Sequence, residues 1–250
     1  MKIKSILVSQ PEPTGDKSPY FDLAKKHNLK IDFRPFIQVE GVPAKEFRQS
    51  RIDILEHTAV IFTSRTAIDH YFRLATELRI TIPDDMKYFC ISEATAVYLQ
   101  KYIVYRKRKV FFGAVRFADL MEIVVKHKSE KFLVPLSDIH KPEIPNSLNK
   151  AKINYTSAIM YRTVSSDLSD LADVNYDILV FYSPSGIKSL FQNFPNFVQN
   201  STYIAGFGPT THKAISEYKL DINIPAPAPG APSMTGALDQ FITKINKGTK

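Results

Sequence analysis

Short apolar runs alternate with amphipathic segments along most of the chain. The apolar runs are residues 5–9, 32–39, 59–63, 88–91, 110–112, 132–135, 157–164, 178–182, 203–206 and 222–224. Most of them show no alternation of apolar and polar positions. Between them, apolar residues recur at helical spacing, as in Ala67, Ile68, Tyr71 and Phe72. Short apolar strands that alternate with amphipathic helices predict parallel sheets covered by helices on both faces.

Two parts of this pattern resemble each other. Residues 60–68 (VIFTSRTAI) match residues 179–187 (LVFYSPSGI), and residues 88–95 match residues 203–210. Each matched piece reads as a strand, a turn and the start of a helix. The second copy then reaches the C-terminus before it is complete, so its missing part has to lie elsewhere in the chain.

The start of the chain supplies that part, because residues 6–12 resemble residues 132–138, and a helix and a long strand follow each. The sequence therefore predicts an α/β fold with two similar parallel-sheet three-layer domains, joined by a two-stranded linker and separated by an interdomain cleft. The predicted boundaries are 1–36 plus 167–250 for a discontinuous domain, 40–162 for an inserted domain, and about 32–39 and 157–166 for the linker strands. Two connections make relative domain motion a natural hypothesis.

Composition places the chain among folded globular proteins. Of its 250 residues, 44% are hydrophobic and 23% are charged. The single Cys90 excludes an internal disulfide framework and any CxxC metal or redox site. Gln10 and Pro11 interrupt the start of the chain before a signal-peptide core could form, and no apolar run approaches the roughly 18 residues of a membrane span. We therefore expect a cytoplasmic protein that does not contact membranes.

The net charge of +8 favours anionic partners, which include nucleic acids, phosphate esters and polycarboxylates. The densest basic stretch is residues 101–109, where Tyr102 and Tyr105 interleave with lysines and arginines. Such an arrangement could stack on a nucleic acid and neutralise it. The simpler interpretation is a solvated helix end followed by a loop.

Several catalytic motifs are absent from the sequence. It contains no GxxxxGK[ST], HExxH or GxSxG pattern, and its six histidines show no metal-ligand spacing. Gly206 and Gly208 follow a strand as in a dinucleotide-binding loop, but Thr211 stands where the third glycine belongs. The sequence therefore gives no support for a P-loop, a zinc protease or an α/β-hydrolase.

A set of turns rich in Ser, Thr and Gly remains, each of which follows a strand and opens a helix. The residues of these turns are Thr63 and Ser64; Ser183, Ser185 and Gly186; and Gly208, Thr210 and Thr211. Helix N-termini offer unpaired N–H groups and a positive dipole end, which suit carboxylates or phosphates. Open α/β sheets bind ligands at this edge. Ordinary helix capping is the alternative explanation for any one turn.

Three of the chain's segments resemble the uroporphyrinogen-III synthase family, and the resemblance extends over essentially the whole chain. They are residues 160–163 (MYRT), 181–186 (FYSPSG) and 208–211 (GPTT), with weaker support from Thr63 and Ser64. The resemblance implies cyclisation of the linear tetrapyrrole hydroxymethylbilane to uroporphyrinogen III, with loss of water and inversion of ring D through a spiro intermediate. This reaction belongs to tetrapyrrole and heme biosynthesis.

The resemblance also implies that the protein uses no organic cofactor and no metal, and that it acts as a monomer. Its partner would be the small-molecule substrate, a linear tetrapyrrole polycarboxylate that suits the basic chain, with no nucleic acid and no membrane involved. The alternative function is a non-catalytic, hinged two-domain binding protein for a polyanionic small molecule. A nucleic-acid binder that uses residues 101–109 is a third hypothesis.

Tyr161 matches the family's functional tyrosine, and the resemblance implies that it donates a proton or a hydrogen bond to the departing hydroxyl. A phenol is protonated at neutral pH and can serve this role. The substrate-binding residues implied are Thr63, Ser64, Ser183, Ser185, Gly186, Gly208, Thr210 and Thr211. Alternatively, Tyr161 packs between domains, and catalysis comes from holding the bilane coiled so that its ends meet.

Overall fold

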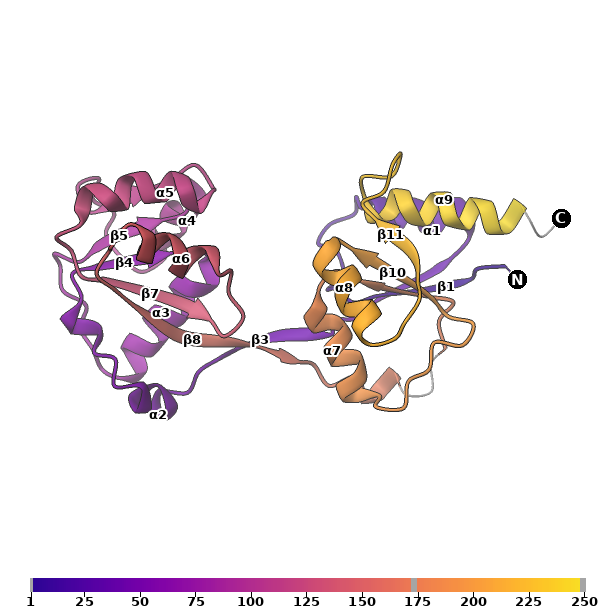
Figure 1. Cartoon of the computed structure of the whole chain (residues 1–250), viewed down its shortest axis with the longest axis horizontal. Coiled ribbons are helices and arrows are strands. Elements are labelled where there is room, and N and C mark those ends of the chain that lie inside the picture. Colours follow the sequence, from indigo (N-terminus) through magenta and orange to yellow (C-terminus); the bar gives the residue numbers. More distant parts are fainter. Residues whose placement is uncertain (1, 172–174, 248–250) are drawn as a thin grey trace. The chain divides into compact units, whose positions relative to one another are not determined.

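The computed structural model describes residues 2–171 and 175–247 of the chain. It divides into two compact units, which are shown in Figure 1. Unit 1 is formed by Met1–Gln38 and Val164–Lys250, and unit 2 by Val39–Thr163. None of the helices in the described part of the chain is long and apolar enough to cross a membrane.

Unit 1 is built on a five-stranded sheet with the strand order β11-β10-β9-β1-β2. Its strands are β1 Ser5–Val8, β2 Lys30–Phe33, β9 Ile178–Phe181, β10 Tyr203–Phe207 and β11 Ile222–Ala226. Its helices are α1 Pro19–His27, α7 Pro184–Asn193, α8 Pro209–Glu217 and α9 Met234–Lys247, with a short 3-10 turn at Ser169–Leu171. Neighbouring strands of this sheet pair in parallel, as the sequence predicts.

Successive residues of the central strands in unit 1 face opposite layers. Ile6 and Val8 of β1 pack on the side of α1 and α9, whereas Leu7 packs on the side of α7 and α8. Figure 1 shows α1 and α9 beside each other over one face of the sheet. Because both faces are covered, a strand needs apolar residues at every position, which explains the unalternating runs in the sequence.

Unit 2 contains a six-stranded sheet with the strand order β3-β8-β7-β4-β5-β6. Its strands are β3 Ile37–Gly41, β4 Ala59–Phe62, β5 Lys87–Cys90, β6 Val110–Phe112, β7 Phe132–Ser137 and β8 Tyr155–Ser165, of which β3 and β8 cross the boundary with unit 1. Its helices are α2 Ala44–Phe47, α3 Arg65–Glu77, α4 Glu93–Tyr98, α5 Phe117–Val124 and α6 Glu143–Lys150. Short 3-10 turns lie at Arg48–Ser50, Ile54–Glu56, Leu99–Lys101 and Val125–His127.

The sheet of unit 2 also has helices on both faces. Strands β8, β7, β4, β5 and β6 pair with their neighbours in parallel. In β4, Val60 and Phe62 pack in the cluster that contains α3 and α4, whereas Ala59 and Ile61 pack in the cluster that contains α5 and α6. The prediction of a doubly wound parallel α/β fold is therefore confirmed.

The prediction of a single long strand at residues 32–39 is wrong. Strand β2 ends at Phe33 and β3 begins at Ile37, and the two strands belong to different sheets. Pro35 lies between them, and it has no N–H group with which a ladder could continue. The buried ring of Phe36 packs edge-on against Phe181, with ring centroids 5.7 Å apart. The other predicted linker strand is continuous, as part of β8.

Candidate functional site

The turn between β4 and α3 carries Thr63 and Ser64 at the carboxyl edge of the sheet in unit 2. Ser64 has extended backbone and caps α3, because its Oγ accepts a hydrogen bond from the N–H of Ala67 at 3.0 Å. The same Oγ lies 3.3 Å from the phenol oxygen of Tyr161, and either hydroxyl can donate in this pair. One serine therefore fixes the start of a helix and contacts the predicted catalytic tyrosine.

A register shift in the ladder between β7 and β8 occurs just before Tyr161 and sets its position in the strand. Leu136 pairs with Ile159, whereas Ser137 pairs with Tyr161, so that Met160 is an extra residue in β8. Such a bulge bends a strand and changes the direction of its side chains. Tyr161 is only 9% exposed, and its side chain packs with the cluster under α3.

A cavity of about 710 Å³ lies beside this pair, and Thr63, Ser64 and Tyr161 all line it. Basic side chains line it as well, namely Arg116, Lys141 and His140, together with the acidic Glu143. Arg116 stands at the start of α5 and forms an ion pair with Asp119, with 2.7 Å between Nη2 and Oδ1. The surroundings of Tyr161 are thus rich in groups that attract anions.

The loop after β7 is ordered by a carboxylate. Asp138 Oδ1 accepts hydrogen bonds from Ser137 Oγ at 2.9 Å, from the N–H of Ile139 at 2.9 Å and from the N–H of Thr163 at 3.0 Å. Partial burial acts to raise the pKa of Asp138, but these donors outweigh it and lower the pKa below its usual value. This carboxylate therefore ties the loop that carries His140 and Lys141 to the end of β8.

The turn between β9 and α7 in unit 1 repeats the capping found at Ser64. Ser183 Oγ accepts a hydrogen bond from the N–H of Gly186 at 3.2 Å, and Pro184 occupies the first helical position. Ser185 is half-buried and Gly186 is buried. A Cβ added to Gly186 would lie 3.5 Å from the Phe181 ring, which is an ordinary contact distance. The neighbouring atoms therefore leave room for a larger residue than glycine at this position.

The turn between β10 and α8 differs, because no side chain caps the helix. Gly208 has φ of 86°, in the left-handed region that favours glycine, and its N–H donates to the carbonyl of Ala226 at 2.7 Å. Thr210 is exposed, whereas Thr211 is 1% exposed. Within the described residues, Thr211 Oγ1 has no hydrogen-bond partner. Uncapped amides and a buried unpaired hydroxyl therefore meet in the first turn of α8.

The predicted site residues fall into two groups. Thr63, Ser64 and Tyr161 line one cavity in unit 2. The remaining residues follow the neighbouring parallel strands β9 and β10 of unit 1; they are Ser183, Ser185, Gly186, Gly208, Thr210 and Thr211. Among the described residues, no cluster of three or more His, Cys, Asp or Glu side chains could hold a metal ion.

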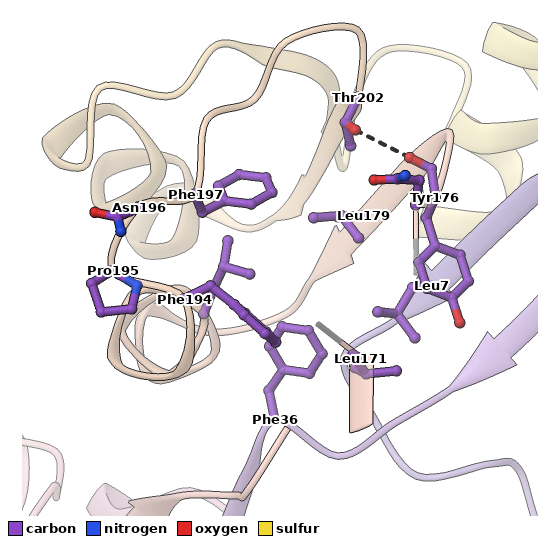
Figure 2. Close-up of a pocket in the computed structure, with 12 residues that line it drawn as sticks. Leu7, Phe36, Leu171, Tyr176, Leu179, Phe194, Pro195, Asn196, Phe197 and Thr202 are labelled. Carbon is purple, nitrogen blue, oxygen red and sulfur yellow. Dashed lines mark hydrogen bonds between the residues drawn. The ribbon is translucent and has the colours of Figure 1, made fainter. Parts of the chain in front are cut away.

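A second cavity, of about 390 Å³, holds none of the predicted site residues (Figure 2). Aromatic and aliphatic side chains such as Phe36, Phe194 and Phe197 line it. Tyr176 and Thr202 also line it; they precede β9 and β10, and Thr202 Oγ1 donates to the Tyr176 carbonyl at 3.1 Å. One end of this cavity thus lies at the amino ends of β9 and β10, and none of the turns described above lines it.

Sequence reasoning missed Arg116, Lys141 and Asp138. Lys141 follows β7, which lies beside β8 in the sheet, whereas Arg116 follows β6 at the far edge and reaches the same cavity at the start of α5; neither placement can be derived from local patterns. A usable signal existed for Arg116, since it directly precedes the helical pattern that begins at Phe117.

In the basic stretch at residues 101–109, Lys101 lies over the rings of Tyr98 and Tyr102 and 3.5 Å from Asp69 Oδ1.

Comparison with known proteins identifies the family of this chain. A family model described as uroporphyrinogen-III synthase HemD matches residues 19–236. No curated protein sequence matches the chain significantly. The crystal structure of uroporphyrinogen-III synthetase from Helicobacter pylori is 16% identical, with a TM-score of 0.59 over 97% of this chain and 100% of that chain.

A mutant uroporphyrinogen III synthase from the extremely thermophilic bacterium Thermus thermophilus is 14% identical, with a TM-score of 0.52 over 98% of this chain and 99% of that chain. At such low identity the two structures establish the fold. The family rests on the sequence model, which covers most of the chain.

Proposed function

Because the chain belongs to the uroporphyrinogen-III synthase family, we propose that Tyr161 and the turns identified above carry its reaction. The enzyme is a cyclising lyase that closes hydroxymethylbilane to uroporphyrinogen III with inversion of ring D and loss of water. The family does not favour the alternative of a non-catalytic binding protein. What remains to be assigned is the part that each residue plays.

Tyr161 protonates the leaving hydroxyl of the hydroxymethyl group in this proposal. The C–O bond breaks, its electron pair leaves with oxygen, and the phenol proton completes a water molecule. The pyrrole nitrogen supplies electrons to the carbon left behind, which accepts the attack of ring D at its substituted α-carbon to give the spiro intermediate. The older bond at that α-carbon then breaks and re-forms at the other α-carbon of ring D, and the proton lost from there balances the one that Tyr161 gave up. A single observation carries this assignment: the Tyr161 phenol lines a cavity rich in basic groups and lies 3.3 Å from Ser64 Oγ.

Ser64 assists the proton transfer. Its Oγ already accepts a hydrogen bond from the Ala67 N–H, so its own proton is free to be donated to the Tyr161 oxygen. A donor at this oxygen stabilises the negative charge that develops there as the proton leaves. Ser64 therefore stabilises the phenol oxygen during proton transfer without contacting the leaving group.

The substrate's carboxylates bind to the basic and helix-terminal groups. In unit 2, Arg116 and Lys141 line the same cavity as Tyr161 and attract carboxylates directly. In unit 1, the first turns of α7 and α8 offer backbone N–H groups and the positive ends of two helix dipoles. Ser183, Ser185 and Thr210 add hydroxyl groups at these turns of unit 1, and Thr63 adds one at the turn before α3 in unit 2. Gly186 and Gly208 contribute through the shape of their turns, because their own N–H groups bond to Ser183 Oγ and to the Ala226 carbonyl.

Thr211 is assigned to substrate binding on account of its unpaired hydroxyl. Buried polar groups almost always find a partner, and an orphan costs stability. Thr211 Oγ1 is such an orphan among the described residues, and it lies in the first turn of an uncapped helix. A substrate group that reaches this turn would supply the missing partner.

The same proposal takes the enzyme to be a cytoplasmic monomer that binds no nucleic acid. The single, buried Cys90 fits a reducing compartment. Two cations of the basic stretch have partners within the chain, since Lys101 pairs with Asp69 and Lys109 donates to the Asp84 carbonyl. Family resemblance supports the monomer, and light scattering of the purified protein tests it.

Product analysis tests the proposed function. Freshly generated hydroxymethylbilane is supplied to the purified chain, the product is oxidised, and the type I and type III isomers are separated. Closure without enzyme gives type I, so we expect type III in excess over a blank. Type I at the blank rate from a folded protein would contradict the catalytic function and return the binding protein to consideration.

A further inference from the structure

The ring of Tyr161 has a second neighbour on α3 besides Ser64. His70 stacks on it, with ring centroids 5.1 Å apart and an angle of 15° between the ring planes. His70 is half-buried and lies in α3, the helix that Ser64 caps. Helix α3 therefore contacts the phenol both at its hydroxyl and on its ring.

Arg73 holds the His70 ring in place. Its Nε–H donates to His70 Nδ1 at 3.1 Å, and its Nη1 pairs with Glu77 Oε1 at 2.7 Å. A histidine that accepts at Nδ1 is neutral there. Burial and the Arg73 charge lower the pKa of His70, and together they outweigh the opposing charges of Asp69 and Glu77. The ring is thus kept as a neutral acceptor.

The same guanidinium also binds the backbone beside Tyr161. Arg73 Nη2 donates to the carbonyl of Val42 at 2.8 Å and to that of Met160 at 3.4 Å, and the Val42 N–H donates to the Met160 carbonyl at 3.0 Å. Gly41 makes room for this arrangement, because a Cβ added there would lie 2.7 Å from Arg73. Arg73 therefore connects the bulge that precedes Tyr161 with the ring that stacks on it.

We propose that His70 is a positioning residue for Tyr161, which keeps the phenol directed along the cavity wall, with Arg73 acting through His70 and through the Met160 carbonyl. The inference rests on the proposed role of Tyr161 as proton donor. His70 acts through the orientation of the phenol. Its contribution is therefore a property of the stacked ring, and another flat ring can replace it.

Two substitutions of His70 separate stacking from other roles. His70→Ala removes the ring, and we expect kcat to fall about 3- to 10-fold with KM changed less than about 2-fold, the range that corresponds to one aromatic pair. His70→Phe keeps a flat ring and should retain kcat within about 2-fold. Phe72→Ala is the matched control. Phe72 also lies on α3, but its ring stacks on Tyr102 instead of Tyr161, so its loss should leave kcat unchanged.

The substitutions are then repeated in a Tyr161→Phe background. If His70 acts through the phenol hydroxyl, His70→Ala should lower kcat of that variant less than about 2-fold. Equal losses in both backgrounds, or an unchanged rate for His70→Ala alone, would overturn the positioning role. A wild-type rate for Tyr161→Phe would instead refute the proposed function of Tyr161. Should His70→Ala not fold, His70→Leu fills the space without a flat ring, and the same losses are expected from it.

Discussion

The hydroxyl oxygen of Ser64 lies 3.3 Å from the phenol oxygen of Tyr161, although the two residues are 97 positions apart in sequence. The contact forms because β4 and β8 both lie beside β7, which brings the end of one strand next to the end of the other. A capping serine and an aromatic residue of a long strand thereby share one cavity wall.

Tyr161→Phe should lower the rate of type III formation at least about 10-fold, because loss of a positioned general acid typically costs about 10²- to 10⁴-fold when no other donor replaces it. Steady-state turnover of hydroxymethylbilane measures the effect. Tyr155→Phe is the matched control: this tyrosine lies at the other end of β8, where its hydroxyl donates to Asn149 Oδ1 at 3.1 Å. An equal loss in both variants would point to a general weakening of the strand.

Ser64→Ala should lower both stability and turnover. Loss of an N-cap side chain costs about 0.5–2 kcal/mol of the free energy of unfolding. Ser92→Ala removes the equivalent cap of α4, where Ser92 Oγ accepts from the Thr95 N–H at 3.3 Å. Urea titrations should show similar destabilisation of the two variants, whereas only Ser64→Ala should reduce kcat. Equal kcat values would show that the contact with Tyr161 does not serve catalysis.

The two glycines of the turns in unit 1 should respond differently to alanine. Gly208→Ala forces a Cβ into a left-handed conformation and should destabilise the protein by about 1–2 kcal/mol, although space for the methyl group is open. Gly186→Ala places a methyl group at ordinary contact distances in a helix, and stability should be unchanged or up to about 1 kcal/mol higher. Thermal unfolding of both variants checks the contrast, and a strongly destabilised Gly186→Ala would contradict it.

Thr211→Val should raise stability while it weakens substrate binding. The substitution replaces a buried, unpaired hydroxyl by a methyl group of similar size, and removing such an orphan yields up to about 1 kcal/mol. If a substrate group is the missing partner, kcat/KM should fall about 2- to 10-fold. Thr210→Val, at an exposed position of the same turn, should bring no gain in stability. An unchanged kcat/KM for Thr211→Val would remove Thr211 from the substrate-binding residues.

Asp138→Asn should reduce stability near neutral pH and have a smaller effect in acid. The folded chain lowers the pKa of Asp138, so the unfolded chain takes up a proton first as the pH falls. The stability contributed by the carboxylate is therefore present above the unfolded pKa, and it is lost as the pH falls through the folded pKa. Urea midpoints at pH 7 and pH 3 measure the difference, with Asp16→Asn as an exposed control. A constant difference across this range would contradict the assignment.

The apolar runs allowed the parallel sheets to be predicted, because a strand with helices over both faces is apolar at consecutive positions, as in Val60 and Ile61. The break at Pro35 was missed, although a residue without an N–H group is itself a signal for the end of a ladder. Tyr161 is a candidate that only the family resemblance supplies. The distance between its phenol and Ser64 depends on strand order and on the bulge at Met160, which local sequence patterns do not specify.

Strand β1 pairs with β9 in the middle of the sheet of unit 1, with Ile6 opposite Ile178. On the ribosome, translation at about 5–20 residues per second therefore leaves β1 waiting roughly 10–30 s for this neighbour. All of unit 2 emerges during that interval, since Val39–Thr163 is one uninterrupted stretch of the chain. Strand β2 can cover one edge of β1 at once, but the edge that faces β9 stays unpaired for longer than most domains take to fold, and such an edge is a site where chaperones can act during synthesis.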